Sequence, residues 1–149
     1  MDYLSELMRS FREIKRTYHN IVQKDAEKVG ITGVQLVVLR ILSENEQINL
    51  GELAQRLKIT NSSLSGIIDR LVQANLIIRD RSKQDRRALI LTLTPEGENV
   101  VKVATGPDSH LYKKINRILE IPEEDLKNLL RIHNEILHKL TSGEDEEND

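Results

Sequence analysis

The stretch that decides the fold runs from residue 50 to residue 71 and reads LGELAQRLKITNSSLSGIIDRL. It contains a short apolar-striped helix, Leu50 to Leu57, and a second helix that Thr60 is expected to cap. Small Ala54 lies in the middle of the first helix, and apolar Ile59 lies in the connection. Two helices that cross steeply need a small residue at closest approach and an apolar side chain in the turn. The stretch therefore predicts a helix-turn-helix.

The second helix has a polar face opposite the stripe that contains Leu64 and Ile67. The short polar residues at its start are Thr60, Asn61, Ser62, Ser63 and Ser65. Such groups can hydrogen-bond to base edges and phosphates, and a helix N-terminus attracts phosphate. Ser and Thr at a helix start are more often only caps, however, and apolar spacing is more often plain core. The two helices alone therefore leave a DNA-reading helix and an ordinary helical core both open.

After residue 75 the pattern changes to that of strands, and a hairpin is predicted from Leu76–Arg79 and Leu89–Leu93, joined by the charged segment Asp80–Arg86. The cations that we assign to DNA contact are Lys83, Arg86 and Arg87. A basic hairpin directly after a recognition helix has the composition of a wing, and a narrow minor groove attracts inserted arginine. Arg87 is the candidate for the minor groove and Arg86 for a phosphate. Asp85 is expected to orient the Arg87 guanidinium through a bidentate pair.

Helices are also predicted on both sides of this region. One spans Leu4 to Lys28, a second spans Thr32 to about Leu42, and a third begins at Thr94-Pro95-Glu96. Gly106-Pro107 should interrupt the helix that begins at Thr94, and Pro122 should open the last helix. The predicted fold class is mostly α with a small two-stranded antiparallel β wing, in the order α-α-α-α-β-β-α-α.

The apolar stripes of the first and last helices exceed what a winged-helix core can cover, so they should bury each other across a two-fold axis. The residues assigned to dimerisation are Leu4, Leu7, Phe11, Leu130, Ile136 and Leu137. The predicted organisation is a dimerisation helix in 1–30, a winged helix-turn-helix core in 31–95, dimerisation helices in 96–141 and an acidic disordered tail in 142–149.

Composition excludes several functions. The 149-residue chain has no Cys, which excludes a disulfide scaffold and a thiol redox sensor. Its longest charge-free stretch has eleven residues, against about 20 for a membrane span, and it starts without a signal-peptide pattern, so a cytoplasmic protein is expected. The net charge of −2 hides an uneven distribution, because residues 56–87 contain eight basic and three acidic residues, whereas five of the last six residues are acidic.

Four segments together resemble the MarR (multiple antibiotic resistance regulator) family: residues 50–71, Asn75–Arg79, Asp85-Arg86-Arg87 and Leu93-Thr94-Pro95-Glu96-Gly97. The Asp-Arg-Arg wing followed by Leu-Thr-x-x-Gly is the most specific part, and the resemblance covers roughly residues 4–141. It implies a homodimeric transcriptional regulator, most often a repressor, that binds a pseudo-palindromic site on double-stranded DNA. It also implies release by a small, often aromatic or phenolic, molecule.

The resemblance implies roles for single residues as well. Asp69 and Arg70 match a family Asp-Arg pair, which is expected to form a structural salt bridge. Three positions depart from the family pattern. Lys58 replaces a common glycine in the turn, Gly66 replaces a larger polar residue in the recognition helix, and Gly106-Pro107 interrupts a helix that is usually continuous.

Two other classes of function compete with a DNA-binding regulator. An enzyme is not expected, because the sequence has no nucleophile elbow, no phosphate-binding glycine loop and no HExxH motif, and His133 and His138 are five residues apart. No metal or cofactor is expected either. The stronger rival is a winged helix that uses its basic hairpin to bind an acidic protein partner instead of DNA.

Overall fold

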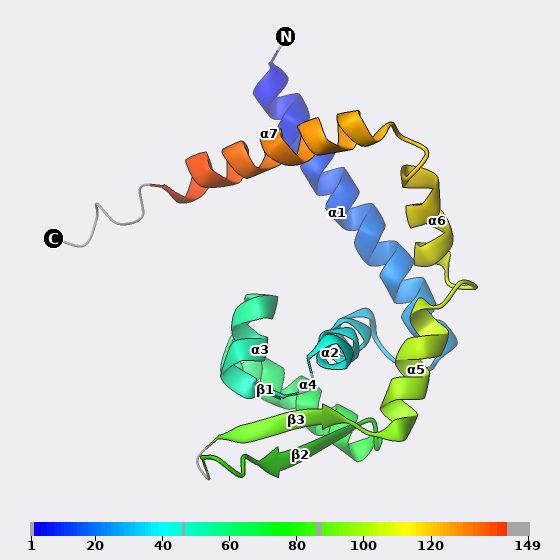
Figure 1. The fold of residues 1–149 in the computed structure, drawn as a ribbon, viewed down its shortest axis with the longest axis vertical. Coiled ribbons are helices and arrows are strands. Elements are labelled where there is room, and N and C mark those ends of the chain that lie inside the picture. The colour runs from blue at the N-terminus through cyan, green and yellow to red at the C-terminus, as the bar shows by residue number, and fades with distance from the viewer. Residues whose placement is uncertain (1, 46, 86–87, 143–149) are drawn as a thin grey trace, which may run out of the picture. The chain divides into compact units, whose positions relative to one another are not determined.

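The computed structural model of the chain describes residues 2–45, 47–85 and 88–142. Its helices and strands are α1 (Tyr3–Lys28), α2 (Gly33–Glu44), β1 (Ile48–Asn49), α3 (Leu50–Leu57), α4 (Asn61–Gln73), β2 (Ile77–Arg81), β3 (Leu89–Leu93), α5 (Pro95–Thr105), α6 (His110–Ile118) and α7 (Glu123–Thr141) (Figure 1). The chain divides into two units, residues 1–113 and residues 114–149. The predicted fold class, mostly α with a small antiparallel sheet, is confirmed.

The two predicted strands pair antiparallel as expected, and the described residues add a third strand that was not predicted, in the order β1-β3-β2. The additional strand, β1, pairs Ile48 with Leu91 and buries the Ile48 side chain to 1% exposure. Two residues are too few to show the alternation by which strands are recognised in a sequence. The strand β2 also begins and ends later than predicted, because Asp80 and Arg81 pair with Ile90 and Leu89 of β3.

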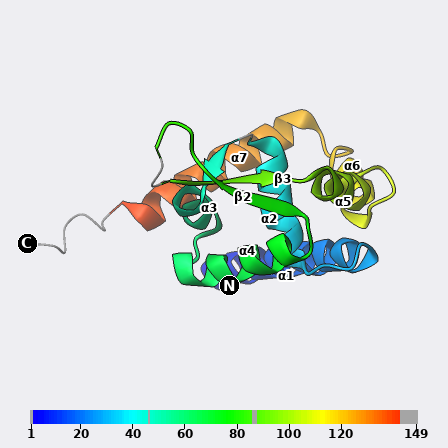
Figure 2. The same ribbon diagram turned by 90° about the horizontal axis from the view of Figure 1, so that it is seen from below.

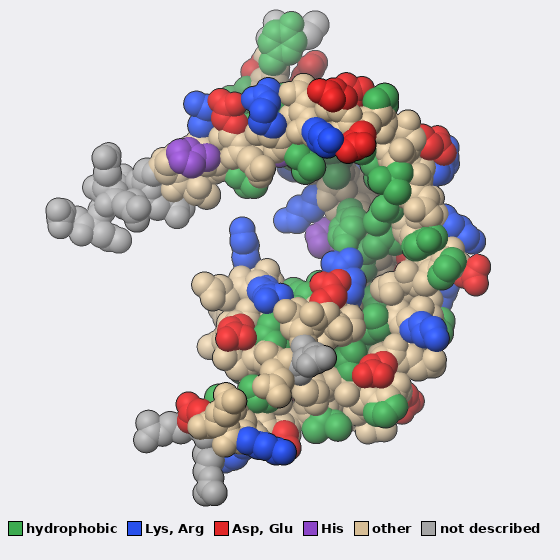
Figure 3. Space-filling model, in the orientation of Figure 1, with side chains coloured by type: hydrophobic (Ala, Val, Ile, Leu, Met, Phe, Trp, Pro, Cys, Tyr) green, Lys and Arg blue, Asp and Glu red, His purple; other side chains and the backbone are tan. Residues whose placement is uncertain are grey.

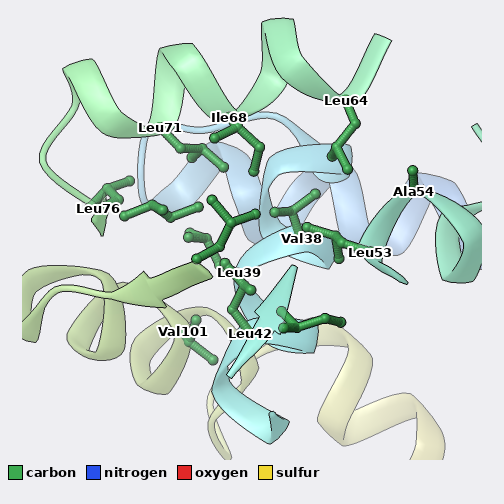
Figure 4. Close-up of a cluster of buried hydrophobic side chains, with 13 residues drawn as sticks. Val38, Leu39, Leu42, Leu53, Ala54, Leu64, Ile68, Leu71, Leu76 and Val101 are labelled. Carbon is green, nitrogen blue, oxygen red and sulfur yellow. The ribbon is translucent and has the colours of Figure 1, made fainter. Parts of the chain in front are cut away.

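The core of the first unit is built around α2. Val38 and Leu39 of this helix are fully buried and pack among residues that include Leu53 of α3 and Leu64 of α4 (Figure 4). Leu91 of β3 belongs to the same buried cluster. The close contacts of α2 extend to α1, α5 and β3. The expectation that the apolar run of α2 is buried is thus confirmed in its interior, whereas Val34 in the first turn remains 44% exposed.

Threonine side chains cap three helices at the positions that the sequence predicts. Thr32 accepts a hydrogen bond from the Gln35 backbone N–H, and the Gln35 side chain accepts one from the Thr32 backbone N–H, which is a capping box. Thr60 caps α4 through the Ser63 N–H, and Thr94 caps α5 through the Gly97 N–H. These caps set where α2, α4 and α5 begin.

The predicted interruption at Gly106-Pro107 is confirmed, because α5 ends at Thr105 and α6 begins at His110. The start of α6 is held by the buried carboxylate of Asp25 on α1, which accepts hydrogen bonds from the His110 and Leu111 backbone N–H groups at 2.8 and 2.9 Å. Negative charge at a helix N-terminus is favourable, so Asp25 joins α1 to the first turn of α6.

The helix α5 contributes to the core, although the sequence assigned it to the dimerisation part. Its Val101 and Ala104 are buried, and the helix packs against α2, α1 and β3. The division of the chain into a DNA-binding part and a dimerisation part stays a prediction.

Thr94 and Gly97 fix the start of α5 against the turn that follows α4. The Thr94 hydroxyl donates to the Asn75 carbonyl at 2.6 Å, and the Thr94 backbone N–H donates to the Leu76 carbonyl at 3.1 Å. A Cβ atom on Gly97 would lie 2.1 Å from that same Leu76 carbonyl oxygen. This close approach is the physical reason for glycine at the fourth position after Leu93.

We therefore expect Gly97→Ala to lower the free energy of unfolding by about 1–3 kcal/mol or more, as overpacking does. The same substitution at Gly66 of α4 is the matched control, because nothing lies within 4 Å of a Cβ there. Gly66→Ala should raise the free energy of unfolding by about 0.5–1 kcal/mol. Urea unfolding of both variants measures the effect, and equal midpoints would contradict the account of Gly97.

Candidate nucleic-acid interface

The turn between α3 and α4 has the predicted packing. Ala54 is buried to 3% exposure, and the Ile59 N–H donates to the Ala54 carbonyl at 3.2 Å while its side chain packs on the core. Lys58 adopts the left-handed conformation with φ of 53° and ψ of 44°. This explains why glycine is common at that position, and the turn accepts a lysine side chain at the cost of backbone strain.

The start of α4 divides the five predicted contact residues into two groups. Thr60 and Ser63 are bound to each other, with 2.9 Å between their hydroxyl oxygens, and Thr60 also caps the helix. Asn61 and Ser62 are exposed, and Ser65 is half-buried. Helical spacing places Ser62 opposite the buried side chains of α4, so the outward face of the helix begins there.

The hairpin of β2 and β3 extends beyond α3 and α4, and its tip is formed by the segment after Arg81 (Figures 1 and 2). Ser82 orders this tip, because its hydroxyl accepts from the Gln84 and Asp85 backbone N–H groups and its own N–H donates to the Ala88 carbonyl at 2.9 Å. Basic and acidic side chains lie next to one another at the hairpin (Figure 3).

Among the predicted wing residues, Lys83 and Asp85 are exposed at the tip. Arg86 and Arg87 lie outside the described residues. Their roles, and the role of Asp85 in orienting Arg87, stay predictions.

The prediction of an ion pair between Asp69 and Arg70 needs correction, because the structure gives Asp69 a different partner. The Arg79 Nη2 atom on β2 lies 2.5 Å from the Asp69 Oδ1 atom on α4. Neighbouring residues on a helix point about 100° apart and do not face each other, so Arg70 is not placed to pair with Asp69. The sequence signal for Arg79 is its spacing: two residues after buried Ile77, it lies on the same face of β2.

The residues predicted to form a dimer interface are largely exposed in the single chain. Leu4, Leu130 and Leu137 are 67%, 62% and 58% exposed, and Leu7 is 37% exposed. Phe11 and Ile136 are half-buried. Large apolar side chains at this exposure on long helices are typical of surfaces that a partner covers.

The described residues include no group of three or more His, Asp or Glu side chains that could hold a metal ion. Within residues 2–45, 47–85 and 88–142, no helix is both long and apolar enough to cross a membrane.

A helix-turn-helix followed directly by a β-hairpin defines a winged-helix protein. Residues 31–89 match the sequence model of the MarR family. The predicted resemblance is therefore confirmed.

Individual relatives agree with this match. The chain is 33% identical over 95 residues to the HTH-type transcriptional repressor MdtR of Bacillus subtilis, an alignment that covers 64% of this chain and 61% of that protein. AbsC, a MarR family transcriptional regulator from Streptomyces coelicolor, is 27% identical in sequence to this chain. Its solved structure superposes with a TM-score of 0.80, and the match covers 94% of this chain and 95% of AbsC. Staphylococcus aureus MarR, solved with salicylate and kanamycin, is 25% identical with a TM-score of 0.76 over 93% of both chains.

The relatives are transcriptional regulators and not enzymes, which confirms the expectation that this chain is not an enzyme.

We expect Thr60→Ala to affect mainly folding stability and Ser62→Ala to affect mainly DNA recognition. Loss of the Thr60 cap should lower the free energy of unfolding by about 1 kcal/mol. Loss of the exposed Ser62 hydroxyl should change it by no more than about 0.5 kcal/mol, but should weaken discrimination between specific and non-specific DNA, since a good base contact contributes about 1–3 kcal/mol. Urea unfolding and gel-shift titrations measure the two effects. Equal destabilisation by both substitutions would assign Ser62 to the helix start and not to the interface.

Proposed function

We propose that this chain is a sequence-specific regulator of transcription that binds double-stranded DNA, with repression as its main action. The observation that supports this most strongly is the combination of an exposed polar face on α4 with a basic hairpin that extends beyond that helix. Its relative MdtR carries the name of a transcriptional repressor.

In this proposal α4 enters the major groove, where Asn61, Ser62 and Ser65 approach base edges and Thr60 and Ser63 contribute mainly the helix cap. The free N–H groups at the start of α4 attract phosphate. The hairpin follows the adjacent minor groove, with Lys83 and Arg86 at phosphates and Arg87 in the groove.

The proposed assembly is a homodimer, since both α1 and α7 present apolar side chains that their own chain leaves exposed. On α1 the exposed stripe includes Leu4 and Leu7, and on α7 it includes Leu130 and Leu137. A two-fold dimer presents two copies of α4, and it therefore requires a DNA site with two inverted halves.

The proposal predicts that DNA selected by the purified protein from a random pool contains a pseudo-palindrome. Light scattering of the free protein should give a species of twice the 17.1 kDa chain mass. The complex with the selected DNA should contain two chains per site. Binding should weaken steeply with salt, because each phosphate contact releases counterions. A 17.1 kDa species that still binds the selected site would contradict the dimer.

The same experiment separates the rival function. A winged helix that binds an acidic protein surface should enrich no sequence from the pool, although its hairpin would still attract DNA weakly at low salt.

We further propose that a small aromatic acid binds between α1, α2 and α5 and releases the DNA. Val22, Leu36 and Ala104 line a small space there, together with Arg40 of α2. Asp25 of α1 also lines it, with its carboxylate already bound to backbone N–H groups of α6. The Arg40 Nε atom is buried and has no hydrogen-bond partner, while its Nη1 atom donates to the Tyr18 hydroxyl at 3.3 Å. An arginine with a buried and unsatisfied N–H group is a partner for a carboxylate.

The space is nearly closed, with about 10 Å³ of free volume, which is no more than one water molecule occupies. A carboxylate with an aromatic ring can enter only if the surrounding helices separate. Since α2 contacts both α1 and α5 within the same unit, such a separation would alter the packing beneath the winged helix. The solved Staphylococcus aureus relative contains salicylate, an acid of this kind.

We expect salicylate to stabilise the protein and to weaken its binding to the selected DNA. At ten times its Kd, the ligand should raise the free energy of unfolding by about 1.4 kcal/mol. Arg40→Met should abolish this response, whereas Arg56→Met, which removes the same charge from an exposed position on α3, should retain it. Thermal unfolding with salicylate, and with its amide as the neutral analogue, measures the effect. An unchanged salicylate response in Arg40→Met would refute the site.

A further inference from the structure

The ion pair between Asp69 and Arg79 joins the two elements that would contact DNA. Asp69 lies in the third turn of α4, and Arg79 lies on β2, the strand that leads into the hairpin tip. Their atoms approach to 2.5 Å. Two other ion pairs, Lys127 with Glu123 and Arg131 with Glu135, join residues four apart on α7 and connect no separate elements.

The position of Asp69 is unusual for a carboxylate. Helical spacing places it with Ser62 and Gly66 on the face of α4 that is opposite the buried Leu64, Ile68 and Leu71. A negative charge on this face opposes the approach of phosphates. Arg79 neutralises this charge. An uncharged residue at this position would also remove the repulsion, so charge balance alone does not explain the carboxylate.

Stability does not account for the pair. The side chains of Arg79 and Asp69 are 35% and 52% exposed, and ion pairs with this exposure contribute little to folding. The packing of α4 against the sheet is set by buried apolar residues such as Ile68 and Ile77. The pair lies beyond that core.

The hairpin is anchored in the core through β3, whereas most of its outer strand β2 is exposed. In β2 only Ile77 is buried, and the following residues from Ile78 to Arg81 are all exposed. The strand is held on one side by β3, and it lies at the edge of the sheet. Beyond Ile77, the bond from Arg79 to Asp69 therefore gives the exposed part of the hairpin a fixed attachment to the recognition helix.

We propose that Asp69 and Arg79 are positioning residues that fix the hairpin relative to α4, so that one rigid surface meets the major and the minor groove together. This inference rests on the proposed DNA-binding function. Functional groups need to be held close to their productive geometry by supporting contacts, and ordering a loose hairpin on binding would cost affinity. Specific binding uses both contacts at a fixed spacing, whereas non-specific binding depends mainly on charge.

The sharpest test is Asp69→Asn, because charge and positioning predict opposite results. The substitution removes a negative charge from the α4 face, so charge alone predicts tighter binding to every DNA. Positioning predicts that binding to the selected site weakens by about two- to thirtyfold, the range usual for such couplings, while binding to unrelated DNA of equal length tightens. The ratio of the two affinities should therefore fall.

Asp80→Asn is the matched control. Asp80 is the next residue of β2 after Arg79, it is exposed, and strand alternation directs its side chain to the opposite face. The substitution makes the same charge change in the same hairpin without touching the pair with α4. We expect it to tighten specific and non-specific binding equally and to leave their ratio unchanged.

A double-variant cycle separates the pair from two independent contacts. If Asp69 and Arg79 act together, Asp69→Asn combined with Arg79→Gln should give no lower affinity ratio than the worse single variant. If the two substitutions lower the ratio of specific to non-specific affinity additively, the two residues do not act together. Hydroxyl-radical footprinting should show loss of protection in the minor groove next to each half-site. Methylation protection at guanine N7 should show that the major-groove contacts are retained, an outcome that a general loss of folding does not produce.

The possible outcomes also distinguish this inference from the function on which it rests. If the wild-type chain selects no DNA sequence, the proposed function fails. If the wild type is specific and Asp69→Asn behaves like Asp80→Asn, only the positioning role fails. Urea unfolding midpoints close to the wild type are expected for all four variants, since every substituted side chain is exposed.

Discussion

The burial of one helix, α2, is the constraint on which the first unit depends. Its Val38, Leu39 and Leu42 are contacted from several sides by apolar residues of α3, α4, β3 and α5. Since close-packed interiors transmit changes in shape, the relative positions of the helix-turn-helix and the sheet follow from how they pack on this helix. The same helix carries Arg40 on the side toward α1, so the DNA-reading elements and the proposed ligand space share one support.

Features that depend on neighbours in the sequence could be predicted, and features that depend on distant partners could not. The caps by Thr32, Thr60 and Thr94 were predicted because a cap and its helix lie within four residues. The strand β1 was missed because its pairing partner, Leu91, is 43 residues away from Ile48 and only that partner makes two residues a strand.

The candidate site shows the same division. The extent of α4 and its exposed polar residues were evident from apolar spacing, whereas the partner of Asp69 lies ten residues further on, in another element. In the sequence Asp69 is next to Arg70, but this adjacency does not bring their side chains into contact. The fold brings Arg79 to Asp69, because buried Ile77 fixes which face of β2 turns toward α4. The contact residues themselves stay predictions, and Arg86 and Arg87 lie outside the described residues.

The net charge of −2 is a poor guide to DNA binding, because charges act locally. At physiological salt, interactions between exposed charges are screened beyond about 8–10 Å. The basic balance of residues 56–87 therefore matters more than the chain average, yet that balance is not fully available to phosphate either. Arg79 is already paired with Asp69, so one cation and one anion of this segment cancel at the recognition helix. The salt dependence of binding should consequently reflect the remaining cations and not the formal charge of the segment.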